Sequence, residues 1–248
     1  MAPEPLISVI TVTYNAENEI SATLGSLKEQ TFTGFEHIVV DGASTDATLS
    51  RVRDAAIPRS VILSEPDKGL YDAMNKGLRL AKGKYVIFLN AGDTFHNPET
   101  LQRYADAGMK DYDIIYGDTC IIDNTGNIIG RRHLNAPAHL DFKSFSKGML
   151  VCHQAFMVKK SLTQDYDLNY RFSADFDWCI NCIKKSRQQN CLNLNEVTIK
   201  FLEAGMSDKN KFRSLQERFR IMNRHYGLPT TLLNHFSFIF RALKRGKV

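Results

Sequence analysis

The sequence predicts an α/β fold in which helices flank a mostly parallel central sheet. Strand-like and helix-like stretches alternate from residue 6 to about residue 117, as in chains built from β–α–β units. Residues 86–89 are apolar at every position, which suits a strand buried on both faces. Acidic residues and glycines follow several strand-like runs, at the place where ligands bind in open α/β sheets.

Each element of the first half follows from a short apolar run or from helical spacing. The apolar runs predict strands over residues 6–13, 35–40, 60–63, 85–89 and 113–116. Apolar residues spaced three or four apart predict helices between them, over residues 20–27, 45–55, 71–81 and 98–110. Because parallel strands need crossover connections, this order predicts a parallel sheet.

Beyond residue 117 the pattern changes. A hairpin is expected over residues 121–129, extended segments over 148–158 and 193–201, and helices over 172–185 and 212–226. After Pro229, one more apolar stripe follows helical spacing at Leu232, Phe236, Ile239 and Leu243. We therefore expect a second half of different construction, followed by amphipathic C-terminal helices.

Length and composition limit the class of protein. The 248 residues contain no apolar run near the roughly 18 residues of a membrane span, and the N-terminus lacks the features of a signal peptide. We expect a cytoplasmic protein, with peripheral association at the inner face of the cell membrane left open. Five cysteines without an export signal predict reduced thiols. The spacing of Cys179 and Cys182 allows a zinc or redox pair, but the lack of a second pair favours buried core residues.

Positive charge is concentrated at the C-terminus. Residues 209–248 carry ten Lys or Arg against one acid, Glu217, in a chain of net charge +5. An apolar stripe beside such cations is typical of a helix in a membrane interface. Residues 228–248 therefore predict contact with a membrane surface, and the alternative is a helix packed on the core. No nucleic-acid partner is expected, because Phe212 and Phe219 fit helix packing better than a stacking surface.

Acidic residues and glycines mark the ends of three successive predicted strands: Asp41-Gly42, Asp67-Lys68-Gly69 and Asp93. The right-handed crossover rule brings these ends to one edge of the sheet, where a shared ligand site is expected. Each sequence alone is also a common turn. No G-x-x-x-x-G-K-[ST] and no G-x-G-x-x-G occurs, which argues against a P-loop enzyme and a Rossmann dehydrogenase.

Three segments together resemble the family 2 inverting glycosyltransferases, which have the GT-A fold: residues 7–15, 40–46 and 89–93. Residues 64–77 further resemble a bacterial branch that builds exopolysaccharide and lipopolysaccharide. The resemblance implies metal-dependent transfer of a sugar from a nucleotide-diphosphate sugar to a hydroxyl of a saccharide or polyprenyl-linked acceptor. It also implies a domain at 1–208, with a nucleotide-sugar-binding half (1–117) and an acceptor half (118–208), and a basic helical extension at 209–248.

The resemblance assigns the donor site position by position. Donor-binding residues are implied at Thr13, Tyr14, Asn15, Asp41, Asp67, Lys68, Gly69, Asn75, Ala91, Gly92 and His153. Asp93 matches the last Asp of the family's D-x-D-type motif, which holds Mn²⁺ or Mg²⁺ on the diphosphate. Gly42 stands where most members have a second Asp near the base. A UDP-sugar donor is favoured, with a GDP-sugar as the alternative.

Asp175 is the implied catalytic base, because Ala174-Asp175 aligns with the family's Glu-Asp motif. The acceptor hydroxyl must lose its proton as it attacks, and a carboxylate can accept that proton. Asp177 is expected to share this role or to orient Asp175. The alternative for Asp175 is a helix N-cap. Trp178 is expected either to stack on a sugar or to pack in the core.

A second hypothesis is a catalytically inactive module that binds nucleotide sugars and tethers partners through its basic tail. Asn90, Gly92 and Ala174 stand where the family has acidic residues, which supports this reading. The presence of Asp93 and Asp175 favours the enzyme.

Overall fold

The computed structural model describes residues 4–187, 190–203 and 210–243. Within these ranges nine strands form one sheet, in the order β3-β2-β1-β4-β8-β6-β9-β5 with β7 paired to β6. The strands are β1 Ile7–Thr13, β2 Phe35–Asp41, β3 Ser60–Ser64, β4 Tyr85–Phe88, β5 Thr94–Phe95, β6 Ile114–Ile122, β7 Ile128–Arg131, β8 Phe156–Lys159 and β9 Cys191–Leu202. The α-helices are α1 Ile20–Lys28, α2 Thr48–Ala55, α3 Leu70–Leu80, α4 Thr100–Met109, α5 Ala174–Lys185, α7 Lys211–Tyr226 and α8 Leu228–Leu243.

The longer strand pairings of the sheet are parallel. β1 pairs in parallel with β2 and β4, and β2 pairs in parallel with β3. β6 and β9 form a further parallel pair, while β8 runs antiparallel to both β4 and β6. The predicted α/β fold with a mostly parallel, helix-flanked sheet is therefore confirmed, with β8 reversing the strand direction at the centre.

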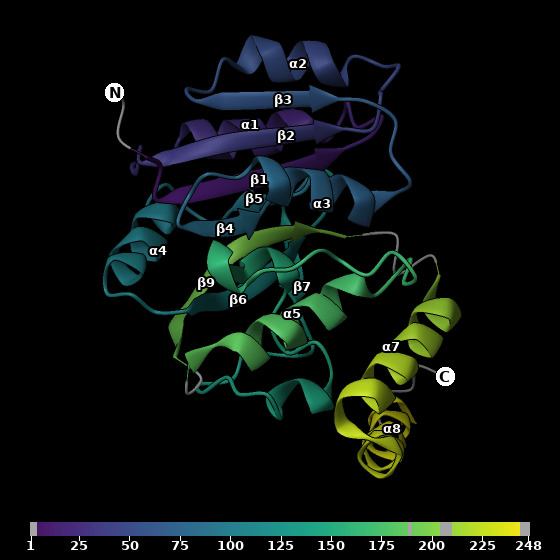
Figure 1. Cartoon of the computed structure of the whole chain (residues 1–248). Coiled ribbons are helices and arrows are strands. Elements are labelled where there is room, and N and C mark those ends of the chain that lie inside the picture. Colours follow the sequence, from purple (N-terminus) through teal and green to yellow (C-terminus); the bar gives the residue numbers. More distant parts are fainter. Residues whose placement is uncertain (1–3, 188–189, 204–209, 244–248) are drawn as a thin grey trace.

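Alternate strand residues point to opposite faces of the sheet, and helices cover both faces (Figure 1). Val9 and Ile87 face a core that also contains side chains of α1, α2 and α4. Ile10 and Phe88 face the other core, with side chains of α3, α5 and α7. Burial on both faces explains why these strands read as continuous apolar runs.

The second half departs from its predicted elements at one segment. The hairpin appears as β6 and β7, and the extended stretch after residue 190 appears as β9. Residues 148–158 were expected to be extended, but the strand β8 begins only at Phe156, and residues 153–155 form the 3-10 turn η2 (His153–Ala155). The polar pair His153 and Gln154 is turned toward a cavity instead of continuing the strand.

Two predicted boundaries bear on the division of the chain. The boundary between residues 117 and 118 falls inside β6, and the boundary at 208/209 falls outside the described residues. The division into halves and a C-terminal extension therefore stays a prediction. Figure 1 shows α7 and α8 at the end of the molecule opposite β3. No helix within the described residues is long and apolar enough to cross a membrane.

The predicted core cysteines lie on α5. Cys179 and Cys182 are fully buried among apolar side chains, and burial raises the pKa of both thiols. The five cysteines are free thiols. The core interpretation of the C-x-x-C spacing is therefore confirmed.

Candidate functional site

A cavity of about 670 Å³ opens where β1 and β4 end. Because these strands are parallel neighbours, their carboxyl ends meet at one edge of the sheet. Eight of the predicted site residues line the cavity: Thr13, Tyr14, Asp67, Gly69, Ala91, Asp93, His153 and Asp175. The acidic residue expected at a strand end and the acidic residue expected at a helix start thus share one hollow, although 82 positions of sequence separate Asp93 from Asp175.

Several polar atoms in this cavity have no protein partner. Thr13 Oγ1, Asn90 Oδ1 and Arg218 Nε are buried, and none has a hydrogen bond to the described residues. They are half of the buried side-chain atoms in that state in the described part of the chain. Buried polar groups are otherwise almost always paired, so this concentration indicates a place built to receive polar ligand atoms.

Asp93 lies at the base of the cavity and is nearly fully buried. Its Oδ1 accepts a hydrogen bond from the backbone N–H of Leu202, and its Oδ2 accepts one from Gln154 Nε2, both at 3.0 Å. Burial raises the pKa of Asp93 to about 7, although these two hydrogen bonds act in the opposite direction. The carboxylate is therefore held in place but poorly solvated, a state that a bound cation would stabilise.

The oxygen atoms near Asp93 suit a hard divalent cation that keeps part of its coordination for a ligand. Asn90 Oδ1 is the unpartnered oxygen in the turn that also carries Asp93, and both residues line the cavity. Within the described residues no group of three or more His, Cys, Asp or Glu side chains converges as a closed metal site. Such a sparse oxygen set matches Mg²⁺ or Mn²⁺ held jointly by protein and phosphate.

Asp175 lies in the first turn of α5, and its carboxylate faces the cavity. The helix N-cap is Ser173, so Asp175 does not serve as the cap. The Tyr71 hydroxyl donates a 3.0 Å hydrogen bond to Asp175 Oδ1. Burial and the charge of Asp175 raise the pKa of Tyr71 well above its usual range, so the phenol keeps its proton and remains a donor.

Tyr71, which bonds Asp175, is itself held in place by a stack of aromatic rings. The ring of Tyr71 stacks on Tyr166 at 5.5 Å, and Tyr166 stacks on Trp178 at 5.0 Å. His153 Nε2 lies 2.6 Å from the Tyr166 hydroxyl, and burial lowers the pKa of His153 to about 4, so the ring is neutral near pH 7. Trp178 is buried in this stack, which confirms the core alternative for its role.

Six predicted site residues do not line the cavity: Asn15, Asp41, Lys68, Asn75, Gly92 and Asp177. Asp41 is buried and accepts hydrogen bonds from Ser44 and Ser64, so it braces the β2 end. Asn75 is also buried, and its amide makes both a donating and an accepting bond to the backbone of Tyr166. Both residues therefore support the cavity wall from within the protein.

Gly92 and Lys68 shape the cavity rim through their backbone, and Asn15 does so through its side chain. Gly92 has φ +95°, and a Cβ atom there would lie 2.6 Å from Leu202 Cδ2, so the turn that presents Asp93 needs glycine. Asn15 Oδ1 accepts a bond from Thr45 N–H, and the backbone N–H of Lys68 donates to Asp72. These contacts shape the loops at the cavity rim.

Asp177, predicted to act with Asp175, contacts α7 and does not line the cavity. Its Oδ1 lies 2.6 Å from His225 Nε2 of α7, and its Oδ2 accepts a bond from Asn181. Two positions along a helix turn a side chain through about 200°, so Asp175 and Asp177 point to different sides of α5. Asp177 holds α7 against α5 and does not reach the cavity.

The structure adds residues that the sequence did not identify. Tyr71, Arg132, Arg171 and Arg218 all line the cavity. Three of them are arginines, but nothing in the local sequence separates them from ordinary surface cations. One feature of the sequence could have identified Tyr71: it is a polar residue two positions after Gly69, on a helix face that is otherwise apolar.

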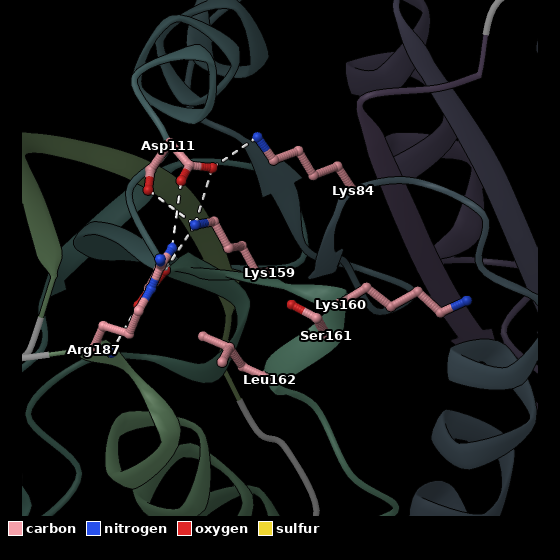
Figure 2. A pocket seen from close by; sticks show the side chains of 8 residues that line it. Lys84, Asp111, Lys159, Lys160, Ser161, Leu162 and Arg187 are labelled. Carbon is pink, nitrogen blue, oxygen red and sulfur yellow. Dashed lines mark hydrogen bonds and ion pairs between the residues drawn. The ribbon is translucent and has the colours of Figure 1, made fainter.

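A second hollow of about 730 Å³ lies at the opposite edge of the sheet. Figure 2 shows Asp111 between Lys84 and Lys159, with Arg187 reaching toward the same carboxylate and Lys160 pointing away. Lys159 also bonds the buried Asp113 at 2.7 Å. Lys84, Lys159 and Arg187 share the two carboxylates, so this cluster ties strand ends together and offers no chemistry for the predicted reaction.

Comparison with known proteins agrees with this geometry. Residues 8–166 match the family described as Glycosyl transferase family 2. A PGL/p-HBAD biosynthesis glycosyltransferase of Mycobacterium bovis is 35% identical over 188 residues, which cover 72% of this chain and 70% of the relative. WfgD of Escherichia coli, a UDP-Glc:alpha-D-GlcNAc-diphosphoundecaprenol beta-1,3-glucosyltransferase, is 25% identical over 219 residues, or 88% of this chain and 85% of WfgD.

The fold also has a close counterpart among solved structures. S. aureus TarS 1–349 in complex with UDP-GlcNAc matches with a TM-score of 0.70 at 20% identity, covering 94% of this chain and 73% of TarS 1–349. That likeness supports the GT-A-type arrangement of sheet and helices. On the family match and the identity to the mycobacterial enzyme, the chain belongs to glycosyl transferase family 2 and is a glycosyltransferase.

Proposed function

We propose that this enzyme transfers a sugar, with inversion, from a nucleotide-diphosphate sugar to a hydroxyl of a lipid-linked or cell-envelope saccharide. The observation that carries the proposal is one cavity lined both by Asp93, beside the unpartnered Asn90 oxygen, and by Asp175. A UDP-sugar is the favoured donor. Tyr14, whose side chain is 64% exposed at the rim, offers a ring on which a base can stack.

The reaction is a single displacement at the anomeric carbon. The acceptor oxygen forms a bond to that carbon while the bond from the carbon to the diphosphate oxygen breaks, and the nucleoside diphosphate leaves with the electron pair. The acceptor proton passes to a carboxylate oxygen of Asp175. Because attack and departure occur on opposite faces of the sugar, one displacement inverts the configuration.

A divalent metal is proposed as the cofactor, with Asp93 and Asn90 as its protein ligands. When bound, Mn²⁺ or Mg²⁺ supplies Lewis-acid stabilisation for the charge that builds on the diphosphate. The hydrogen bonds from Leu202 and Gln154 fix the orientation of the Asp93 carboxylate. Five residues implied to bind the donor do not line the cavity, and we propose that they contribute by holding its walls in shape: Asn15, Asp41, Lys68, Asn75 and Gly92.

The acceptor is proposed to be a lipid-linked saccharide met at a membrane surface. WfgD, by its name, acts on a diphosphoundecaprenol-linked sugar. Leu228, Leu232 and Phe236 follow one another four residues apart on α8, and all three are exposed. The side of α8 next to this row packs inward, with Thr231 buried and the His235 ring 5.0 Å from Phe219. Residues 244–248, with their cations, lie outside the described residues.

A thermal-shift screen of UDP- and GDP-sugars with Mn²⁺ tests the proposal. We expect one UDP-sugar to raise the melting temperature more than UDP alone, and slow hydrolysis of that donor to disappear in Asp93→Ala. Donor binding without any hydrolysis or transfer would favour the inactive tethering module. Failure of every nucleotide sugar to stabilise the protein would contradict the proposed function.

A further inference from the structure

We infer that Arg171 and Arg218 bind a phosphate group of the acceptor lipid, and that Phe212 and Leu215 contact its hydrocarbon chain. This inference rests on the proposed transfer to a lipid-linked acceptor. It gives a ligand to these two arginines and two apolar residues, none of which has a role in the proposed transfer of the sugar.

The cavity carries positive charge on the side of α5 and α7. Arg171 precedes α5, which carries Asp175, and Arg218 projects from α7. Both line the cavity, and neither forms an ion pair within the described residues. Arg218 Nε is buried without a hydrogen-bond partner there. An arginine in that state matches a phosphate, which accepts two parallel N–H bonds from a guanidinium.

Hydrogen bonds join the segment that carries Arg171 to α7, which carries Arg218. Glu217, the residue before Arg218, accepts hydrogen bonds from the backbone N–H groups of Arg171 and Phe172 at 2.9 and 2.8 Å. Ser173 Oγ lies 3.0 Å from Ser214 Oγ of α7. These contacts join the segment before α5 to α7, so Arg171 and Arg218 are held as one unit beside Asp175.

Two apolar residues of α7, Phe212 and Leu215, form a row that extends from Arg218 toward the start of the helix. Phe212, Leu215 and Arg218 succeed one another three residues apart, so their side chains are neighbours on the helix surface. Phe212 is 73% exposed and Leu215 is 54% exposed. A cation inside the cavity followed by large exposed apolar residues matches a ligand that has a charged head and a hydrocarbon tail.

The donor diphosphate is the other phosphate that enters this cavity, and the two sources can be told apart. The proposed donor residues Asp93, Asn90 and Thr13 come from the ends of β1 and β4. The two arginines come from the segment before α5 and from α7, on the side that carries the base. Occupying the donor site with UDP and Mn²⁺ therefore leaves the arginines free for an acceptor phosphate.

Calorimetric titration of the full-length protein, saturated with UDP and Mn²⁺, tests the inference with farnesyl diphosphate and farnesol as probes. We expect wild type to bind farnesyl diphosphate at least about tenfold more tightly than farnesol, because charge-assisted hydrogen bonds to the phosphate are lost with the alcohol. Arg218→Met and Arg171→Met should each abolish most of that difference while UDP affinity stays within about twofold. Arg213→Met, which removes an exposed cation from the same helix, is the matched control and should behave as wild type.

Two further variants test the contact between the apolar row and the hydrocarbon chain. Phe212→Ser and Leu215→Ser should weaken both farnesyl probes and leave the affinity for inorganic pyrophosphate unchanged. If Arg218→Met does not fold, Arg171→Met tests the contact with phosphate, because Arg171 is exposed and its replacement should not disturb folding. Equal binding of farnesyl diphosphate and farnesol by wild type, or an arginine variant that weakens UDP and spares farnesyl diphosphate, would overturn the inference. Failure of wild type to bind either UDP or GDP would instead overturn the proposed function.

Discussion

At the scale of single residues, the account depends on how two carboxylates are held. Asp93 is fixed by Leu202 and Gln154, and Asp175 is fixed by Tyr71. Each carboxylate is held by hydrogen bonds from the protein, and both residues line the cavity. The partners of both come from distant parts of the sequence, and this explains why motif spacing alone could not identify them.

Tyr71 should act as a positioning residue for Asp175. Tyr71→Phe keeps the ring stack but removes the hydroxyl that donates to the carboxylate, so we expect the transfer rate to fall about tenfold with little change in donor KM. Tyr116→Phe, which also loses a buried hydroxyl bond, is the control. An unchanged transfer rate in Tyr71→Phe would refute this role.

Asp93 should couple metal binding to donor binding. Asp93→Asn keeps the shape of the side chain and removes its charge, so we expect Mn²⁺ to lose at least about tenfold in affinity, measured by titration followed by electron paramagnetic resonance. UDP affinity in EDTA serves as the internal reference and should change little. Mn²⁺ binding of wild-type strength in the variant would exclude Asp93 as a ligand.

At the scale of elements, α8 presents an apolar side to solvent and a polar side to α7. Packing on the core was the alternative from the sequence, and α8 does pack on α7. Its exposed leucines and Phe236 nevertheless remain without a partner among the described residues. The contact with a lipid surface therefore remains a proposal that concerns this exposed side alone.

Phe236→Glu tests that surface. Placing a charge on the apolar side should reduce cosedimentation with vesicles of anionic lipid several-fold, because the charge must leave water for the interface. Met109→Glu puts the same charge on an exposed apolar residue of α4 and should bind vesicles as wild type does. Equal retention of all three proteins by the vesicles would remove the membrane from the account.

The sequence predicts those features that depend on local patterns of apolar residues. It does not predict side-chain positions that depend on contacts between distant elements. The apolar runs of β1, β2 and β4 are visible because both sheet faces are covered, and the strand ends then locate Asp93. Asp177 and Asn75 were assigned by motif position, but helix phase and a contact with Tyr166 direct them away from the cavity. Arg218 enters the site only because α7 packs on α5, a contact that no local pattern encodes.

At the scale of the whole molecule, buried titratable groups set the pH dependence of stability. Burial lowers the pKa of His37 and of His153 to about 4, so each is neutral in the folded protein but gains a proton on unfolding below pH 6.5. Asp93, with its pKa raised to about 7, holds a proton in the folded state that the unfolded chain releases above pH 4. His37 and His153, together with His96, whose pKa burial also lowers, therefore favour stability that is lost as pH falls, and Asp93 opposes them.

Urea unfolding of the metal-free protein in EDTA measures this balance. Between about pH 5 and 6 the free energy of unfolding should fall by at least about 1.4 kcal/mol per pH unit as pH decreases, the effect of one net proton. Asp93→Asn removes the opposing group, so its slope should be steeper by about 1.4 kcal/mol per pH unit over the same window. Equal slopes for the two proteins would show that Asp93 does not titrate there.

The measurement closest to the central claim is the kinetics of Asp175→Asn with the donor that the thermal-shift screen identifies. If Asp175 takes the acceptor proton in the cavity that also binds the nucleotide diphosphate, the variant should bind UDP with Mn²⁺ as wild type does. Its rate of transfer should nevertheless fall by about 10²–10⁴-fold. Transfer at a rate within about twofold of wild type would contradict the account, because the cavity would then contain another base.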